Sequence, residues 1–104
     1  MITAITAFRM PKPVTREEAR NIFLSTAPKY LGVSGLIQKV YYVSLEENTL
    51  GGIYLWKSKA EAEAMYTESW KTFVREKYGT EATVTYLDCP VVVDNNLNQI
   101  ISDE

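Results

Sequence analysis

The sequence has no histidine among its 104 residues. Serine or cysteine nucleophiles activated by histidine, histidine zinc sites, histidine-ligated haem and facial-triad iron each need at least one imidazole. These classes of chemistry are therefore excluded for this chain. The carboxylate pairs Glu17-Glu18, Glu46-Glu47 and Glu61/Glu63 lie at expected helix starts and at a hairpin tip, where solvated carboxylates are usual. We therefore expect no bound metal.

Cysteine is almost absent as well, and Cys89 alone cannot form a disulfide within the chain. It lies in an apolar segment, where thiols are usually inert core residues. The five glycines form neither GxGxxG nor a Walker pattern, so we expect no nucleotide cofactor. The net charge is −2, and basic residues are interleaved with acidic ones rather than gathered in a stripe. This pattern does not favour a nucleic-acid partner.

Long hydrophobic runs are missing too, because no apolar stretch approaches the roughly 18 residues that span a membrane. Strand-like residues begin at Ile2 without a basic leader and apolar signal region. The sequence thus predicts a cytoplasmic protein without a membrane partner. Its length fits one domain over residues 1–104, with a core over 1–94 and a polar C-terminal tail over 95–104.

The first half of the chain predicts a strand, a helix and a β-hairpin. Residues 2–8 form the strand, and Thr15 with Glu18 fits a capping box that starts the helix. Pro28 should bend or end this helix. Two aromatic-rich strands are then expected over 36–45 and 50–56, joined by a short polar turn over 46–49.

The second half predicts another helix and strand. Ser58 and Glu61 repeat the capping-box spacing, and an apolar stripe at helical spacing runs from Ala62 to Val74, with a break at Thr67 allowed. Strands are expected over 82–89 and, after Pro90, over 91–93. The order βαββαβ predicts an α+β, ferredoxin-like fold with a four-stranded antiparallel sheet and both helices on one face.

The strand over 36–45 is unusual because neither of its faces looks solvated. We expect one face to carry Leu36, Gln38, Val40 and Tyr42, and the other to carry Ile37, Lys39, Tyr41 and Val43. A bare sheet face of this composition would be a large apolar patch for a monomer. The sequence therefore predicts a homodimer with sheets face to face, with the segment after Pro90 reaching across.

The strings GLIQKVYY, GGIYLW and SKAEAEAMY give the chain its family resemblance. It resembles the YdhR-type putative mono-oxygenases of the dimeric α+β barrel superfamily, from the first strand to about residue 95. The resemblance implies a small-molecule cavity between sheet and helices and mono-oxygenase activity without a cofactor. Lys39 and the pair Gly51-Gly52 match the YdhR-like pattern. Haem-degrading relatives use a histidine ligand, so this chain departs from that branch.

The candidate site gathers around the lysine. Cofactor-free oxygenation needs only a group that holds an anion and groups that position an electron-rich substrate. We expect Lys39 and Tyr54 to be catalytic, and the substrate-binding residues to be Tyr41, Trp56, Tyr66 and Trp70. The base would be Asp88, a lysine of lowered pKa, or water. If the strand faces are reversed, Gln38 and Tyr42 replace Lys39 and Tyr41.

Three functions remain open at this level. The first is a cofactor-independent mono-oxygenase acting on a small aromatic or quinonoid compound. The second is a module that binds a small hydrophobic ligand without converting it. The third is a structural or stress-related dimer whose aromatic residues only pack, which predicts a filled interior.

Overall fold

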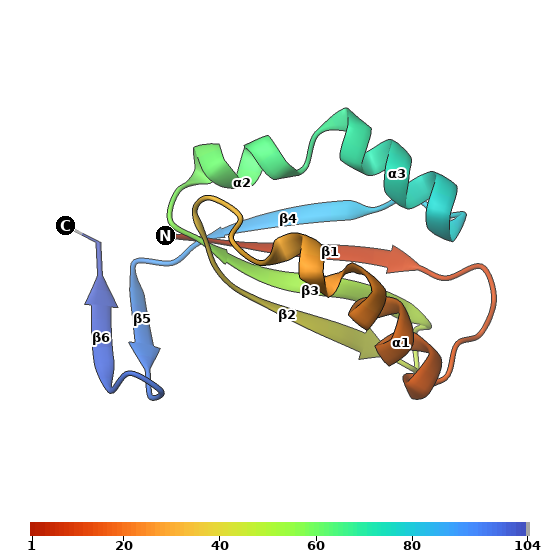
Figure 1. Ribbon diagram of the computed structural model, residues 1–104, viewed down its shortest axis with the longest axis horizontal. Helices are drawn as coiled ribbons and strands as arrows, with labels where there is room; N and C mark the ends of the chain where they lie inside the picture. The colour runs from red at the N-terminus through yellow and green to blue at the C-terminus, as the bar shows by residue number, and fades with distance from the viewer. Residues whose placement is uncertain (104) are drawn as a thin grey trace.

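A computed structural model describes residues 1–103 of the chain (Figure 1). The elements along the chain are β1 (Ile2–Arg9), α1 (Arg16–Thr26), the 3₁₀ helix η1 (Ala27–Tyr30), β2 (Leu36–Ser44), β3 (Thr49–Trp56), α2 (Lys59–Met65), α3 (Glu68–Tyr78), β4 (Thr83–Asp88), β5 (Val91–Asp94) and β6 (Gln99–Ser102). The main sheet has the order β2-β3-β1-β4, with every neighbouring pair antiparallel. Figure 1 shows the helices on one side of this sheet. The predicted ferredoxin-like α+β fold is confirmed. No helix within residues 1–103 has the length and apolar character needed to cross a membrane.

The first helix begins where its capping residues predict. Thr15 Oγ1 accepts a hydrogen bond from the Glu18 amide at 3.1 Å, and Glu18 Oε1 accepts one from the Thr15 amide at 3.1 Å. The α-helix ends at Thr26, and Pro28 lies in the following 3₁₀ turn. This turn matters for the site because it places Tyr30 over the sheet.

The cap of α2 differs from the predicted capping box. Ser58 Oγ accepts from the Glu61 amide at 3.2 Å, as predicted. The Glu61 carboxylate, however, accepts from the hydroxyls of Ser58 and Ser34 rather than from the Ser58 amide. The side chain is therefore used to hold the loop before β2 against α2.

The apolar stripe from Ala62 to Val74 spans two helices instead of one. α2 ends at Met65, Tyr66 leaves helical geometry, and Thr67 caps α3 by accepting from the Trp70 amide at 3.2 Å. The break allowed at Thr67 is thus present. It turns the Tyr66 ring into the core, where the residue is 6% exposed.

The C-terminal segment contains a strand that the sequence pattern did not indicate. Residues 95–104 read as a polar tail, but β6 lies within them and pairs with β5 in a separate hairpin. A four-residue strand whose two isoleucines are adjacent shows no clear alternation, which explains the difference. Figure 1 shows this hairpin projecting from one end of the main sheet.

The two faces of the main sheet differ in burial. The helix side carries the core, whose fully buried side chains include Leu50, Tyr54 and Trp56. The other face is half-exposed and carries the row Val40, Ile53 and Ile5 across β2, β3 and β1. Leu36 does not share this face as predicted, because an irregularity between Leu36 and Gln38 shifts the register, and Leu36 packs on the core.

Candidate functional site

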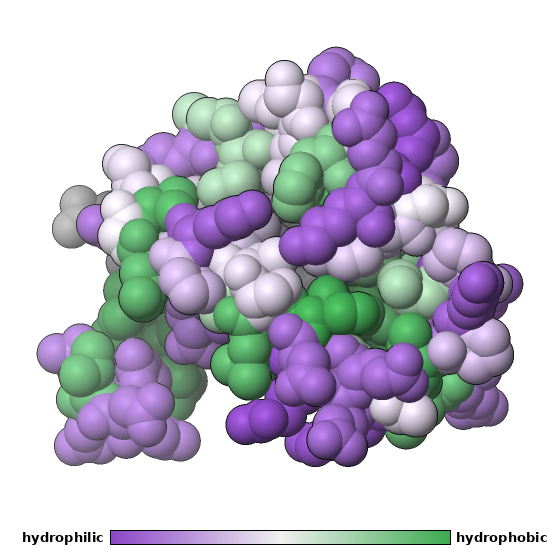
Figure 2. Space-filling model, turned by 45° about the vertical axis from the view of Figure 1, so that its right-hand side comes forward, coloured by the Kyte–Doolittle hydropathy of each residue, from purple (hydrophilic) through white to green (hydrophobic). Residues whose placement is uncertain are grey.

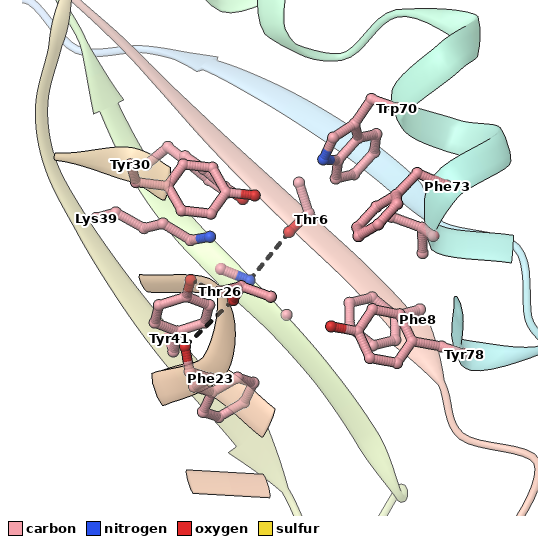
Figure 3. Close-up of a pocket in the computed structure, with 14 residues that line it drawn as sticks. Thr6, Phe8, Phe23, Thr26, Tyr30, Lys39, Tyr41, Trp70, Phe73 and Tyr78 are labelled. Carbon is pink, nitrogen blue, oxygen red and sulfur yellow. Dashed lines mark hydrogen bonds between the residues drawn. The ribbon is translucent and has the colours of Figure 1, made fainter. Parts of the chain in front are cut away.

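A narrow cavity lies between the sheet and the helices, where β1, β2 and β3 face α1, η1 and α3 (Figure 3). Its aromatic lining residues are Phe8, Phe23, Tyr30, Tyr41, Tyr54, Trp70, Phe73 and Tyr78. The free volume is about 40 Å³. A buried water needs roughly 10–15 Å³ by this measure, so the cavity holds a few waters and no aromatic ring system in this conformation.

Lys39 is the only charged side chain among the described residues that line this cavity. Its Nζ lies 3.3 Å from the ring centroid of Tyr30, 3.9 Å from that of Tyr41 and 4.4 Å from that of Tyr54. Within residues 1–103 no carboxylate forms an ion pair with it. The amine is therefore held by three aromatic faces, which attract its charged form, without an anionic partner.

Burial changes the acid–base behaviour of this group. Desolvation lowers the pKa of Lys39 from 10.5 to about 7, because the ammonium loses water and meets no carboxylate. Desolvation also raises the pKa of Tyr54 and of Tyr66, so both phenols stay protonated at neutral pH. The pKa of Tyr78 rises to about 12 for the same reason. The site thus pairs a partly neutral amine with neutral phenol donors.

Two glycines in β3 make room for the side chains around the lysine. Gly52 lies opposite Tyr41 and faces the cavity, where a Cβ would come within 2.9 Å of Lys39 Cε and 2.8 Å of Tyr54 Cε1. Gly51 lies opposite Tyr42 on the other face. The Tyr42 ring crosses it, and the hydroxyl donates to the Thr6 carbonyl at 2.9 Å. The glycine pair thus admits one side chain on each face.

The helix side fixes the outer wall of the cavity. Tyr41 stacks on Phe23 with ring centroids 4.6 Å apart, and its hydroxyl lies 2.8 Å from Thr26 Oγ1. Thr26 is the last residue of α1 and also donates to the Phe23 carbonyl at 3.2 Å. The rings of Tyr30, Tyr41 and Tyr54 around the Lys39 amine form an aromatic cage, and a hydrogen bond holds the Tyr41 ring to the end of α1.

The structure brings together four of the six residues expected at the site. Lys39, Tyr41, Tyr54 and Trp70 line the cavity, and Lys39 and Tyr41 face the helices. Trp56 and Tyr66 lie in the adjoining core instead, where Trp56 Nε1 donates to the Tyr66 hydroxyl at 3.1 Å. Gln38 and Tyr42, the alternatives for a reversed strand, are absent from the lining.

Sequence reasoning missed Tyr30, the ring nearest the lysine amine. It lies in a short 3₁₀ turn, where no hydrophobic period marks which side chains point inward. Tyr30 lines the cavity and also two outer hollows, one beside Lys39 and Tyr41 and the other beside Trp70 and Phe73. Tyr30 therefore borders the interior and both outer hollows.

No carboxylate lines the cavity within the described residues. Asp88, one candidate base, lies at the end of β4 and is exposed. Across residues 1–103 no group of three or more cysteine, aspartate or glutamate side chains comes together in a way that suits a metal ion. Lys39 is thus the basic group that the cavity offers.

The lysine predicts a pH dependence of stability. Below about pH 7 it is protonated in both states, and the folded protein carries the full desolvation cost. As pH rises from about 7 towards 10.5 the folded state loses the proton first, so the free energy of unfolding should increase. We expect this increase in wild type but not in Lys39→Met, measured by urea unfolding from about pH 6 to about pH 9, below tyrosine ionisation. Parallel curves for the two proteins would contradict the assignment.

The fold is that of known small oxygenases. A structure from Deinococcus radiodurans, described as a putative antibiotic biosynthesis monooxygenase, matches with a TM-score of 0.64 at 9% identity, covering 90% of this chain and 97% of that chain. The monooxygenase from the gene ActVA-Orf6 of Streptomyces coelicolor, in complex with nanaomycin D, matches with a TM-score of 0.62 at 12% identity, covering 85% and 86%. SnoaB, a cofactor-independent oxygenase from Streptomyces nogalater, gives 0.59 at 12% identity, covering 85% and 91%. These identities establish a shared fold and nothing more.

The family is given by a sequence match. Residues 5–88 match the family described as "Putative mono-oxygenase ydhR", and the chain belongs to that family. The match includes Lys39 and both glycines of β3. The resemblance inferred from the strand and helix strings is therefore confirmed. The comparison with curated proteins finds no match.

Proposed function

We propose that the chain is a cofactor-independent mono-oxygenase that oxidises a small, electron-rich aromatic compound in the cavity around Lys39. The observation that carries this proposal is an amine of lowered pKa, without a carboxylate partner, in a cavity walled by aromatic rings. Membership of the mono-oxygenase family and the fold shared with cofactor-independent oxygenases support it.

The chemistry needs few protein groups. The neutral amine of Lys39 accepts the proton of a phenol or enol, and the resulting ammonium holds the anion. The anion transfers one electron to O2, and the substrate radical and superoxide then combine through a new C–O bond. Loss of water from the peroxide leaves one oxygen atom in the product and the other in water, with both hydrogens supplied by the substrate. Tyr54 and the Trp70 indole are the neutral donors beside the oxygen atoms.

Binding requires the cage to open, because the free volume is too small for an aromatic ring. Tyr30 borders the cavity and both outer hollows, so rotation of its side chain is the smallest change that makes room for an aromatic ring. The fused or single ring of the substrate then takes the place of the Tyr30 ring over Lys39. An aromatic substrate is favoured because it replaces the ring contacts that the move removes.

Oxygen uptake is the direct test. The purified protein, treated with a chelator, is mixed with anthrone, naphthohydroquinone or catechol in an oxygen electrode. A parallel reaction under isotopically labelled O2 shows whether an oxygen atom from O2 enters the product. We expect uptake above the uncatalysed rate with at least one compound, and one labelled oxygen atom per product molecule. Uptake no faster than the uncatalysed rate with every compound would overturn the proposal.

The small free volume also favours a second candidate, a structural dimer with a filled interior. This candidate predicts that none of the aromatic compounds binds. Tryptophan fluorescence separates the two, because Trp70 lines the cavity and a bound quinonoid ring would quench it. Quenching that saturates supports an open, ligand-binding cavity, whereas an unchanged spectrum supports the structural dimer.

We also propose that the chain is a homodimer. The two copies would meet through the open face of the main sheet, which is the face that the helices do not cover. By the strand register, the charged side chain on this face is Arg9 at the end of β1, and Val40, Ile53 and Leu87 in its middle are 40–48% exposed. A contiguous apolar sheet face of this kind usually marks an interface. A twofold axis would place the same patch on both partners and bury both at once.

The β5–β6 hairpin supports the same arrangement. Isolated hairpins are marginal in water, yet Val93 and Ile100 are 66% and 75% exposed here. Figure 2 shows hydrophobic surface along the hairpin, which stands apart from the body of the chain. A groove between the hairpin and the open sheet face is lined by Ile37, Leu55 and Val92. We expect the second copy to fill this groove.

A charge at the centre of the open face should separate the dimer. In Ile53→Glu the symmetric interface would bury two unpaired carboxylates, so we expect the dissociation constant to rise by at least about 100-fold. Light scattering coupled to size exclusion measures the subunit count. The matched control is Leu24→Glu on α1, where the side chain is 54% exposed and the dimer should persist. A wild-type monomer, or a dimeric Ile53→Glu, would overturn the arrangement.

A further inference from the structure

Lys39 differs from the other lysines of the chain in its surroundings. Lys29, Lys59 and Lys77 also lie near aromatic rings, with Nζ 4.6–5.8 Å from the centroids, but they are exposed. Lys39 is half-buried, and within residues 1–103 its Nζ makes no ion pair and no hydrogen bond. A desolvated amine without a hydrogen-bond partner keeps its lone pair free, which is the condition for a nucleophilic lysine.

The space beside this amine limits what can reach it. About 40 Å³ is free in the closed conformation, which corresponds to about three waters. A molecule of three or four non-hydrogen atoms therefore enters without displacing Tyr30. Figure 3 shows the Lys39 amine pointing into the cavity between Tyr30 and Tyr41. The outer hollow beside the same three residues gives the path from solvent.

The walls are also suited to a neutral, polar guest. The Tyr54 phenol stays protonated because burial raises its pKa, so it can donate a hydrogen bond to a carbonyl oxygen. No carboxylate or other cation lines the cavity within the described residues, and the remaining titratable groups that line it are Tyr30, Tyr41 and Tyr78. A small aldehyde meets these conditions, because it has one acceptor oxygen, no charge and an electrophilic carbon.

We propose that Lys39 is a carbonyl-reactive lysine that forms a reversible imine with small aldehydes. The Nζ lone pair attacks the carbonyl carbon, the carbonyl π electrons move to oxygen, and a proton passes from nitrogen to that oxygen to give a carbinolamine. Loss of water then forms the C=N bond. The overall change is amine plus aldehyde to imine plus water, with no oxidant or reductant. The reaction is independent of the proposed oxygenase activity because it uses no O2.

Reductive trapping tests the proposal. The full chain is incubated at about pH 7 with acetaldehyde and sodium cyanoborohydride, and peptide mass spectrometry locates the ethylated lysines. An amine with the reference pKa of lysine is almost entirely protonated at this pH. Lys39 is about half neutral. We expect Lys39 to be ethylated at least about tenfold faster than Lys29, Lys59 or Lys77, which serve as internal controls.

A pH profile separates reactivity from simple access. Ethylation of Lys39 should rise with a midpoint near pH 7. Lys39→Arg keeps the charge and should remove only the fast-labelled site. Uniform labelling of all lysines, or slower labelling of Lys39 than of the controls, would overturn the proposal. The oxygen-uptake assay is unaffected by that outcome, so the two proposals fail separately.

Discussion

Replacing Lys39 with methionine should lower the rate of oxygen uptake by about 100-fold or more, because the cavity then has no group to take the substrate proton or hold the anion. Methionine matches the lysine side chain as far as Cε and lacks only the amine, so most of the contacts with the surrounding rings should remain. Removal of one electrostatic contact in a dry active site costs about 10²–10³ in turnover. The oxygen electrode measures the effect with the best substrate for wild type.

The matched control is Lys29→Met. Lys29 also lies over an aromatic ring, that of Phe73, and borders a hollow beside the cavity, but it is exposed and does not line the interior. We expect its uptake rate to stay within about twofold of wild type, since exposed charges contribute little. Equal rates for wild type and Lys39→Met would show that the lysine takes no part in the reaction. The proposed catalytic site would then be wrong.

Gly51→Ala should be the most destabilising small substitution in the sheet. A Cβ at this position would lie 1.9 Å from the Thr6 carbonyl oxygen and 2.6 Å from the Tyr42 hydroxyl. The backbone of β1 would have to move, and the hydrogen bond from Tyr42 to Thr6 would break. Overpacking typically costs about 1–3 kcal/mol, and a backbone clash belongs at or above the upper end. We therefore expect a loss of at least about 3 kcal/mol in the free energy of unfolding.

Gly52→Ala is the control for that experiment, because it adds the same methyl group to the adjacent residue. Here the nearest atoms are the ends of two side chains, Tyr54 Cε1 and Lys39 Cε, rather than backbone. The lysine can withdraw, so we expect a smaller loss of about 1 kcal/mol. Turnover should fall as Nζ leaves the cavity. Urea unfolding of both variants decides the point, and equal losses of stability would show that the two glycines are not distinguished by what each methyl meets.

The parts of the fold that sequence analysis predicted correctly are those with local signals. Thr15, Ser58 and Thr67 each mark a helix start, because a hydroxyl that caps a helix acts within four residues of the chain. The capping box at Glu61 was wrong in one bond, because Ser34 is distant in sequence and competes for the carboxylate.

The candidate site was predictable to the extent that it lies on regular strands. Alternation along β2 predicts that Lys39 and Tyr41 share a face. The pairing of Lys39 with Tyr54 comes from the structure, in which the hairpin closes at Ser44 and Thr49. Alternation does not predict the irregularity after Leu36, which depends on packing against the core. Tyr30 was missed for another reason, since a four-residue 3₁₀ turn has no period to detect.

The groups proposed to react with the substrate and the ring that limits the size of the substrate lie on different elements of the fold. The amine and its phenol neighbours come from paired strands, where a substitution disturbs several hydrogen-bonded partners at once. The ring that closes the cavity comes from a single turn bounded by Pro28 and Gly32. Homologous chains with the same strands and different turns in this segment would therefore share a reaction and differ in the dimensions of the molecules they accept.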